Sequence, residues 1–209
     1  MDLKTTYNKI AKDWMQDHRD DTWWIEGTDT YLSFLTFGAL ILDVGCGGGE
    51  KSKYFIEKGF SVVGVDFSEE MIRFAKEKVP AGQFFVKDIQ QPLGLKDKFD
   101  GVIAQAVLLH IPKRNILAVL KNIIAPLKLG GYFYAALKEK KSGGPDEETV
   151  RENDYGHDYE RFFSYFTLSE VKDILARVGL QVLHEYASTS RSKTHWIQII
   201  AKKTDITLL

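Results

Sequence analysis

The chain has 209 residues, of which 44% are hydrophobic and 27% are charged, and its formal net charge is −1. This composition is typical of a folded globular domain, and the balanced charge predicts no broad attraction to nucleic acid or anionic membranes. The one cysteine, Cys46, excludes an intrachain disulfide and a thiolate metal cluster. The N-terminus lacks the apolar core of a signal peptide, and no apolar run has the roughly 18–20 residues of a membrane span. We therefore expect a soluble, cytoplasmic protein that binds no metal.

The spacing of apolar residues predicts helices and strands in a regular order. The segment before residue 40 contains two predicted helices, over 7–16 and 30–37. Further along the chain, strands are predicted over 40–44, 61–65, 83–86, 100–105 and 132–137, with helices over 50–58, after Ser68 and over 116–127. The last part predicts a helix over 168–178 and strands over 181–186 and 196–201. A long polar stretch from 138 to about 159 shows no pattern of a helix or strand.

Strands that alternate with helices indicate a parallel sheet covered on both faces. The last two predicted strands are separated only by a polar loop, so they are expected to pair antiparallel at one edge. The fold class is therefore α/β, with a doubly wound, mostly parallel seven-stranded sheet and an antiparallel C-terminal hairpin. The N-terminal helices precede the first strand and are expected to lie across the top of the sheet.

Four glycines follow the first predicted strand within five positions, in the sequence ILDVGCGGGE at 41–50. Glycine inside an element costs roughly 0.5–1 kcal/mol relative to alanine, so such a cluster needs a reason. In doubly wound sheets, ligands bind at the carboxyl ends of the strands. Glycines there permit a tight turn and let a ligand approach the backbone and the free N–H groups of the next helix.

Acidic residues close the second and third predicted strands. Asp66 lies about 20 residues beyond the glycines, where a carboxylate accepts hydrogen bonds from the hydroxyls of a bound ribose. Asp88 is placed where it could meet an amino group on an adenine ring. Aspartate is also a common turn residue, so each position alone has a purely structural alternative. Together with the glycines and Asp43, they favour a nucleoside ligand.

These stretches resemble the motifs of class I S-adenosylmethionine-dependent methyltransferases. The resemblance covers about 41–138 and is carried, in order, by LDVGCGGG, VVGVDFSEEMI, FVKDI, FDGVIAQAVLLHIP and LKLGGYFYAALK. It implies a Rossmann-like methyltransferase fold. It also implies S-adenosyl-L-methionine as cofactor and S-adenosyl-L-homocysteine as product.

The resemblance also implies a set of cofactor-binding residues: Asp43, Gly45, Cys46, Gly47, Asp66, Phe67, Asp88, Ile89 and Gln105. The backbone at 45–47 would pass close to the methionine part and the ribose. Asp43 would orient the ammonium group, Asp66 would bind ribose and Phe67 would flank the adenine. Asp88 and Ile89 would contact the adenine edge, and Gln105 would lie near the methionine end.

The chain is expected to form one methyltransferase domain with distinct parts. The parts are an N-terminal helical lid (1–38), a cofactor-binding core (39–138), a substrate loop (139–166) and a C-terminal helix with a hairpin (167–204). The segment YNKIAKDW resembles the N-terminal lid of many small methyltransferases, in which an aromatic residue such as Tyr7 covers the cofactor.

Residues near the predicted cofactor end suggest acid–base and substrate-binding groups. An O–H or N–H acceptor must lose a proton, whereas a carboxylate acceptor need not, and His110, His157 and Asp158 are candidate general bases. Arg161 and Arg191 suit bidentate recognition of an anionic substrate. Each of these residues also has a purely structural alternative. His110 could be a packing residue, His157 an exposed loop residue, and the two arginines ordinary surface residues.

The favoured function is methyl transfer to an O or N atom of a small molecule. A first alternative is a tRNA methyltransferase, because the C-terminal part loosely resembles wobble-uridine enzymes, with RFFS at 161–164 where those have an R-Y-Y-H-like segment. Further alternatives are a non-catalytic cofactor-binding protein and an NAD-dependent oxidoreductase. The expected partner is a small-molecule methyl acceptor, with nucleic acid as a less favoured alternative and no membrane, and the sequence leaves the oligomeric state open.

Overall fold

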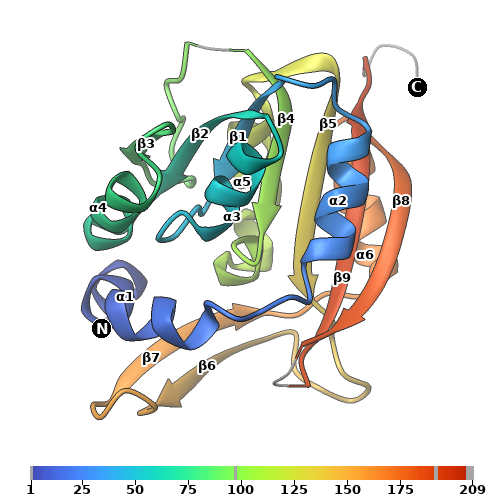
Figure 1. Ribbon diagram of the computed structural model, residues 1–209. Helices are drawn as coiled ribbons and strands as arrows, with labels where there is room; N and C mark the ends of the chain where they lie inside the picture. Colours follow the sequence, from blue (N-terminus) through green and yellow to red (C-terminus); the bar gives the residue numbers. More distant parts are fainter. Residues whose placement is uncertain (1, 97, 191–192, 206–209) are drawn as a thin grey trace.

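The computed structural model describes residues 2–96, 98–190 and 193–205 (Figure 1). The strands are β1 Leu40–Val44, β2 Ser61–Asp66, β3 Gln83–Val86, β4 Phe99–Gln105, β5 Leu127–Lys138, β6 Glu147–Glu152, β7 Tyr159–Ser164, β8 Leu180–Thr189 and β9 His195–Lys203. The α-helices are α1 Leu3–His18, α2 Ile25–Ser33, α3 Glu50–Glu57, α4 Glu69–Lys78, α5 Ile116–Ile124 and α6 Leu168–Ala176. Within these described ranges, no helix is long and apolar enough to cross a lipid bilayer.

One seven-stranded sheet forms the centre of the molecule, in the order β3-β2-β1-β4-β5-β9-β8. The strands from β1 to β5 pair in parallel, whereas β9 runs antiparallel to both β5 and β8. This arrangement confirms the doubly wound sheet with an antiparallel C-terminal pair. The order reverses between β1 and β4, and such a reversal places a binding crevice at the carboxyl ends of these strands.

Successive strand residues point to opposite faces of the sheet, and each face is covered by helices. Leu42 belongs to the core cluster that packs under α5 and α6, and its neighbour Ile41 belongs to the cluster under α2 and α3. Figure 1 shows α2 lying along the front of β5 and β9. The prediction that both N-terminal helices lie across the top is therefore wrong for α2. The buried Tyr31 explains the difference, because its ring packs on Tyr134 of β5.

A two-stranded sheet of β6 and β7 lies apart from the main sheet, within a segment for which no element was predicted over most of its length. The strand β6 carries the sequence EETVRE, whose residues are exposed or half-buried, so it has no apolar alternation that would indicate a strand. Its partner β7 supplies the anchors Tyr159 and Phe163, which are 2% and 3% exposed. Contacts far away in the sequence therefore stabilise this hairpin, and it packs beside α1 at the carboxyl edge of the main sheet (Figure 1).

Candidate active site

A cavity of about 440 Å³ lies at the carboxyl edge of the sheet. Its wall combines the glycine turn after β1, the ends of β2, β4 and β5, helix α1, the β6–β7 hairpin and Trp196 of β9. This volume is in the range of small-molecule sites. Several residues predicted from the sequence line it: Gly45, Cys46, Gly47, Asp66, Phe67, Gln105, His110 and Arg161.

The glycine turn presents bare backbone to the cavity. Gly45 and Gly47 have φ angles of +67° and +52°, a left-handed region that side chains disfavour. A Cβ atom added at Gly47 would lie 3.9 Å from the side chains of Met71 and Trp14, an ordinary van der Waals distance, so it would fit without a clash. At Gly48, by contrast, an added Cβ would collide with the Met15 side chain of α1. Gly47 is therefore the position where a ligand can approach the backbone.

Asp66 ties the end of β2 to the glycine turn. One carboxylate oxygen accepts the Gly47 N–H at 3.0 Å, and the other accepts the Ser68 N–H at 2.9 Å. The residue is 7% exposed, and burial raises the pKa of its carboxyl to about 6. A carboxylate can accept about four hydrogen bonds, so Asp66 retains capacity for ribose hydroxyls.

Gln105 lines the cavity with an unsatisfied side chain. It is 3% exposed, and neither its amide nitrogen nor its amide oxygen has a partner in the described part of the chain. Buried polar groups are nearly always hydrogen-bonded, so a ligand with a donor and an acceptor fits here.

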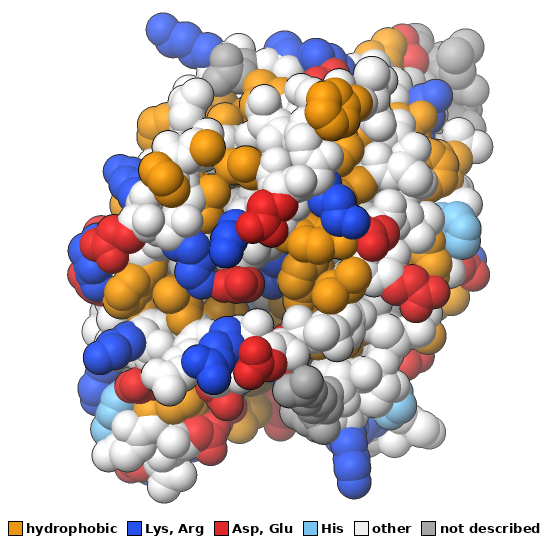
Figure 2. Space-filling view, viewed as in Figure 1, with side chains coloured by type: hydrophobic (Ala, Val, Ile, Leu, Met, Phe, Trp, Pro, Cys, Tyr) orange, Lys and Arg blue, Asp and Glu red, His pale blue; other side chains and the backbone are white. Residues whose placement is uncertain are grey.

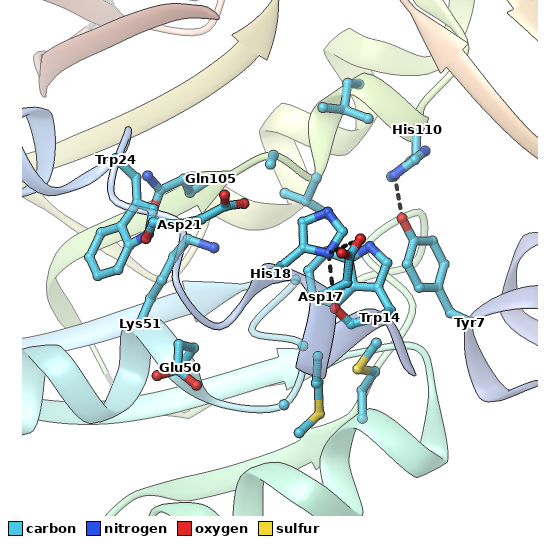
Figure 3. A pocket seen from close by; sticks show the side chains of 18 of the residues that line it. Tyr7, Trp14, Asp17, His18, Asp21, Trp24, Glu50, Lys51, Gln105 and His110 are labelled. Atoms are coloured by element: carbon cyan, nitrogen blue, oxygen red, sulfur yellow. Dashed lines mark hydrogen bonds and ion pairs between the residues drawn. The ribbon is translucent and has the colours of Figure 1, made fainter. Parts of the chain in front are cut away.

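Figure 3 shows Asp21 and Lys51 on the same side of the cavity as Gln105, a pair of opposite charges that no sequence motif indicated. Together these groups suit the amino-acid end of the adenosyl cofactor.

Three predicted cofactor residues do not line this cavity. Asp43 is 2% exposed and accepts a hydrogen bond from the Ser52 hydroxyl of α3 at 2.6 Å. Asp88 is exposed and accepts the Gln90 N–H at 2.9 Å, as a turn residue does. Ile89 is buried in the main core. Their assigned contacts with the cofactor stay predictions.

His110 joins three distant segments. Its Nδ1 lies 2.8 Å from the Phe162 carbonyl oxygen of β7, and its Nε2 lies 2.9 Å from the Tyr7 hydroxyl of α1 (Figure 3). A carbonyl only accepts, so Nδ1 carries the proton and Nε2 accepts from Tyr7. Burial lowers the His110 pKa to about 3, which keeps the ring neutral at physiological pH. Both nitrogens are engaged, so this geometry suits positioning of α1, and a general-base role stays a prediction.

The other predicted catalytic groups lie on or near the hairpin. His157 follows β6, packs against the Tyr159 ring at 6.1 Å and is not part of the cavity wall. Asp158 is exposed and pairs with Arg151 at 2.6 Å. Arg161 lines the cavity, and its guanidinium donates two hydrogen bonds of 2.5 Å to Glu152. Arg191 lies outside the described residues.

Tyr7→Phe is expected to loosen the N-terminal helix. The substitution leaves Nε2 of the half-buried His110 without its donor, which costs about 1 kcal/mol of unfolding free energy. For a chain of this size, thermal melting should fall by about 2–4 °C per kcal/mol. Tyr155→Phe is the matched control, because its hydroxyl contacts the exposed Asp17 at 3.3 Å. Equal melting temperatures for the two variants would argue against the contact between Tyr7 and His110.

Comparison with known proteins places this geometry in a family. A family described as "Methyltransferase domain" matches residues 17–185. A Bacillus subtilis protein named as a methyltransferase is 36% identical over 118 residues, which are 53% of this chain and 45% of that protein. A Schizosaccharomyces pombe tRNA (carboxymethyluridine(34)-5-O)-methyltransferase is 25% identical and is matched over 86% of this chain and 89% of its own. This chain thus spans about half of the first relative and most of the second.

Solved structures share the fold. The Burkholderia thailandensis 1,6-didemethyltoxoflavin-N1-methyltransferase, with bound 1,6-didemethyltoxoflavin and S-adenosylhomocysteine, has a TM-score of 0.78. That match covers 97% of this chain and 88% of the other chain at 22% identity. Given the family match over most of its length and this fold, the chain belongs to the methyltransferase domain family, as a class I S-adenosylmethionine-dependent methyltransferase.

Proposed function

We propose that the protein transfers a methyl group from S-adenosylmethionine to an O or N atom of a small molecule. One observation carries this proposal. The cavity runs from the cofactor residues Gly47 and Asp66 to the hairpin and Trp196, and α1 with the hairpin covers it. A covered site of about 440 Å³ suits a compact acceptor better than a polymer. The Burkholderia relative of known structure is also named for an N-methyl transfer to a small molecule.

In this proposal the protein mainly positions the reactants. The cofactor, when bound, supplies a sulfonium methyl group that is already activated for transfer. Asp66 holds the ribose, the bare backbone at Gly47 permits close approach, and Gln105 fixes the amino-acid end. The hairpin and α1 exclude water and orient the acceptor. Such orientation can lower a barrier by several kcal/mol.

An O–H or N–H acceptor also needs a group that takes its proton. His18 of α1 lines the cavity, and its Nδ1 lies 2.9 Å from the Trp14 carbonyl oxygen, so Nδ1 donates there. Its Nε2 is then an acceptor in the neutral ring. His18 stacks on the Trp14 ring at 4.3 Å, which fixes its plane (Figure 3). We therefore add His18 to His110 as a candidate general base.

A modified tRNA base is the second candidate acceptor. The S. pombe relative, which carries that activity in its name, supports it over 86% of this chain. An RNA substrate needs a basic surface around the site, since phosphate contacts dominate such binding. On the face shown in Figure 2, lysine and arginine side chains are interspersed with acidic ones. That face therefore favours a small molecule.

The test begins with ligand binding and continues to turnover. S-adenosylhomocysteine at 100 times its dissociation constant should stabilise the protein by about 2.7 kcal/mol, whereas NAD should give no shift. A metabolite library and total tRNA are then incubated with radiolabelled S-adenosylmethionine. Label in a small molecule is the expected result. If only tRNA is labelled, the acceptor is a tRNA base and not a small molecule. If S-adenosylhomocysteine causes no shift in stability, the proposal is overturned.

A further inference from the structure

Lys138 places a positive charge inside the cavity. It is the last residue of β5, its half-buried side chain lines the wall, and its Nζ lies 3.6 Å from the centre of the Phe163 ring. No ion pair with another described residue holds this ammonium group. Burial and the positive charge of Arg161 lower the Lys138 pKa to about 8, while the negative charges of Glu152 and Glu148 oppose that shift. The group is thus still mainly a cation at neutral pH.

The neighbouring charges cancel each other. Arg161 and Glu152 form a two-pronged ion pair, and their side chains are only 16% and 17% exposed. The pair contributes no net charge to this end of the cavity. One positive charge, that of Lys138, is therefore left among these three side chains. Burying a cation is costly unless it is paired, so the arrangement favours an anionic ligand.

A second unpaired donor lies directly opposite Lys138. Trp196 of β9 is its partner in the antiparallel register, lines the same cavity and is 7% exposed. The indole Nε1 of Trp196 has no acceptor among the residues described. The ring stacks on Trp23 at 4.2 Å with an interplanar angle of 6°. The cavity thus offers two donors beside flat aromatic surfaces.

We propose that Lys138 and the Trp196 indole N–H bind the carboxylate of an aromatic methyl acceptor. This inference rests on the proposed function, because it names the class of its small-molecule substrate. A single uncompensated charge matches a monoanion such as a carboxylate better than a doubly charged phosphate. Arg161 is paired with Glu152 and forms part of the cavity wall beside the bound carboxylate. The competing explanation is that the contact between Lys138 and Phe163 only stabilises the fold.

Matched ligand pairs distinguish these explanations. The probes are benzoate and benzamide, salicylate and salicylamide, and indole-3-acetate and indole-3-acetamide, with inorganic phosphate added as a competitor. Binding to the full chain, saturated with S-adenosylhomocysteine, is measured by calorimetry. At least one carboxylate is expected to bind at least tenfold more tightly than its amide. Lys138→Met should remove that preference, and Lys138→Arg should restore part of it.

Lys202→Met is the control, since Lys202 lies over Tyr132 of β5 and outside the cavity wall, and it should keep the wild-type preference. Equal binding of acids and amides, no binding of any carboxylate, or a preference that survives in Lys138→Met would overturn the inference. If inorganic phosphate binds in competition as tightly as the acids do, the group recognised at this site is a phosphate and not a carboxylate. Each of these results, obtained with a protein that binds S-adenosylhomocysteine, leaves the methyltransferase proposal standing. If the wild type does not bind S-adenosylhomocysteine, that proposal is defeated instead.

Discussion

Asp66→Asn is expected to weaken S-adenosylhomocysteine binding by about 2–4 kcal/mol, or roughly 30- to 700-fold. The variant loses the charge that we propose accepts the ribose hydroxyls, and hydrogen bonds to charged groups are the stronger ones. Its amide nitrogen would also face the N–H of Gly47 or Ser68, both of which now donate to the carboxylate. Calorimetry measures the loss of affinity.

The pH dependence of this affinity gives a second readout. Burial raises the pKa of the Asp66 carboxyl to about 6, and in the proposed role only the ionised form accepts hydrogen bonds from both ribose hydroxyls. Affinity should therefore be greatest above pH 6 and fall below it, by up to about tenfold per pH unit. The Asp66→Asn variant should lose this dependence.

Asp29→Asn is the matched control, because Asp29 accepts a hydrogen bond from Tyr54 and lies outside the cavity wall. The control should bind as the wild type does at every pH. If Asp66→Asn binds with unchanged affinity, Asp66 is not the ribose ligand.

Glu152→Ala is expected to destabilise the protein by about 2–4 kcal/mol. The substitution leaves the Arg161 guanidinium, whose side chain is 16% exposed, without its carboxylate partner. Breaking a buried pair on one side is costly, because the remaining charge stays desolvated. Thermal melting should fall by roughly 5–15 °C, which differential scanning calorimetry measures directly.

The double variant Glu152→Leu with Arg161→Met tests whether the unpaired charge of Arg161 causes this destabilisation. Replacing both charges by apolar groups should recover most of the loss, since it leaves no unpaired charge. The control Glu77→Ala removes an exposed pair with Arg73 and should cost no more than about 1 kcal/mol. A Glu152→Ala variant as stable as this control would show that the pair contributes little.

The glycine turn and the strand ends beside it could be predicted from the sequence because their signals are local. A buried strand, four glycines and the next helix follow one another within 40–57, and Asp66 ends the second strand. These elements are set by short-range periodicity and by backbone conformations that glycine favours. The parallel sheet then brings the strand ends to one edge, whatever the rest of the chain does. The structure accordingly places Gly45, Gly47, Asp66 and Gln105 around one cavity.

The proposed acceptor half depends on contacts between residues far apart in the chain. Tyr7 is hydrogen-bonded to His110, which lies 103 residues further along the chain. Trp23, in the segment before α2, stacks on Trp196 of the last strand. The strand β6 has a polar sequence, and its pairing with β7 and the anchors Tyr159 and Phe163 stabilise it. Lys138 gives these three side chains their net positive charge of one, because Glu152 neutralises Arg161. Local sequence thus determined the glycine turn and the sheet, whereas long-range packing alone decided the end of the cavity formed by α1, the β6–β7 hairpin and Trp196.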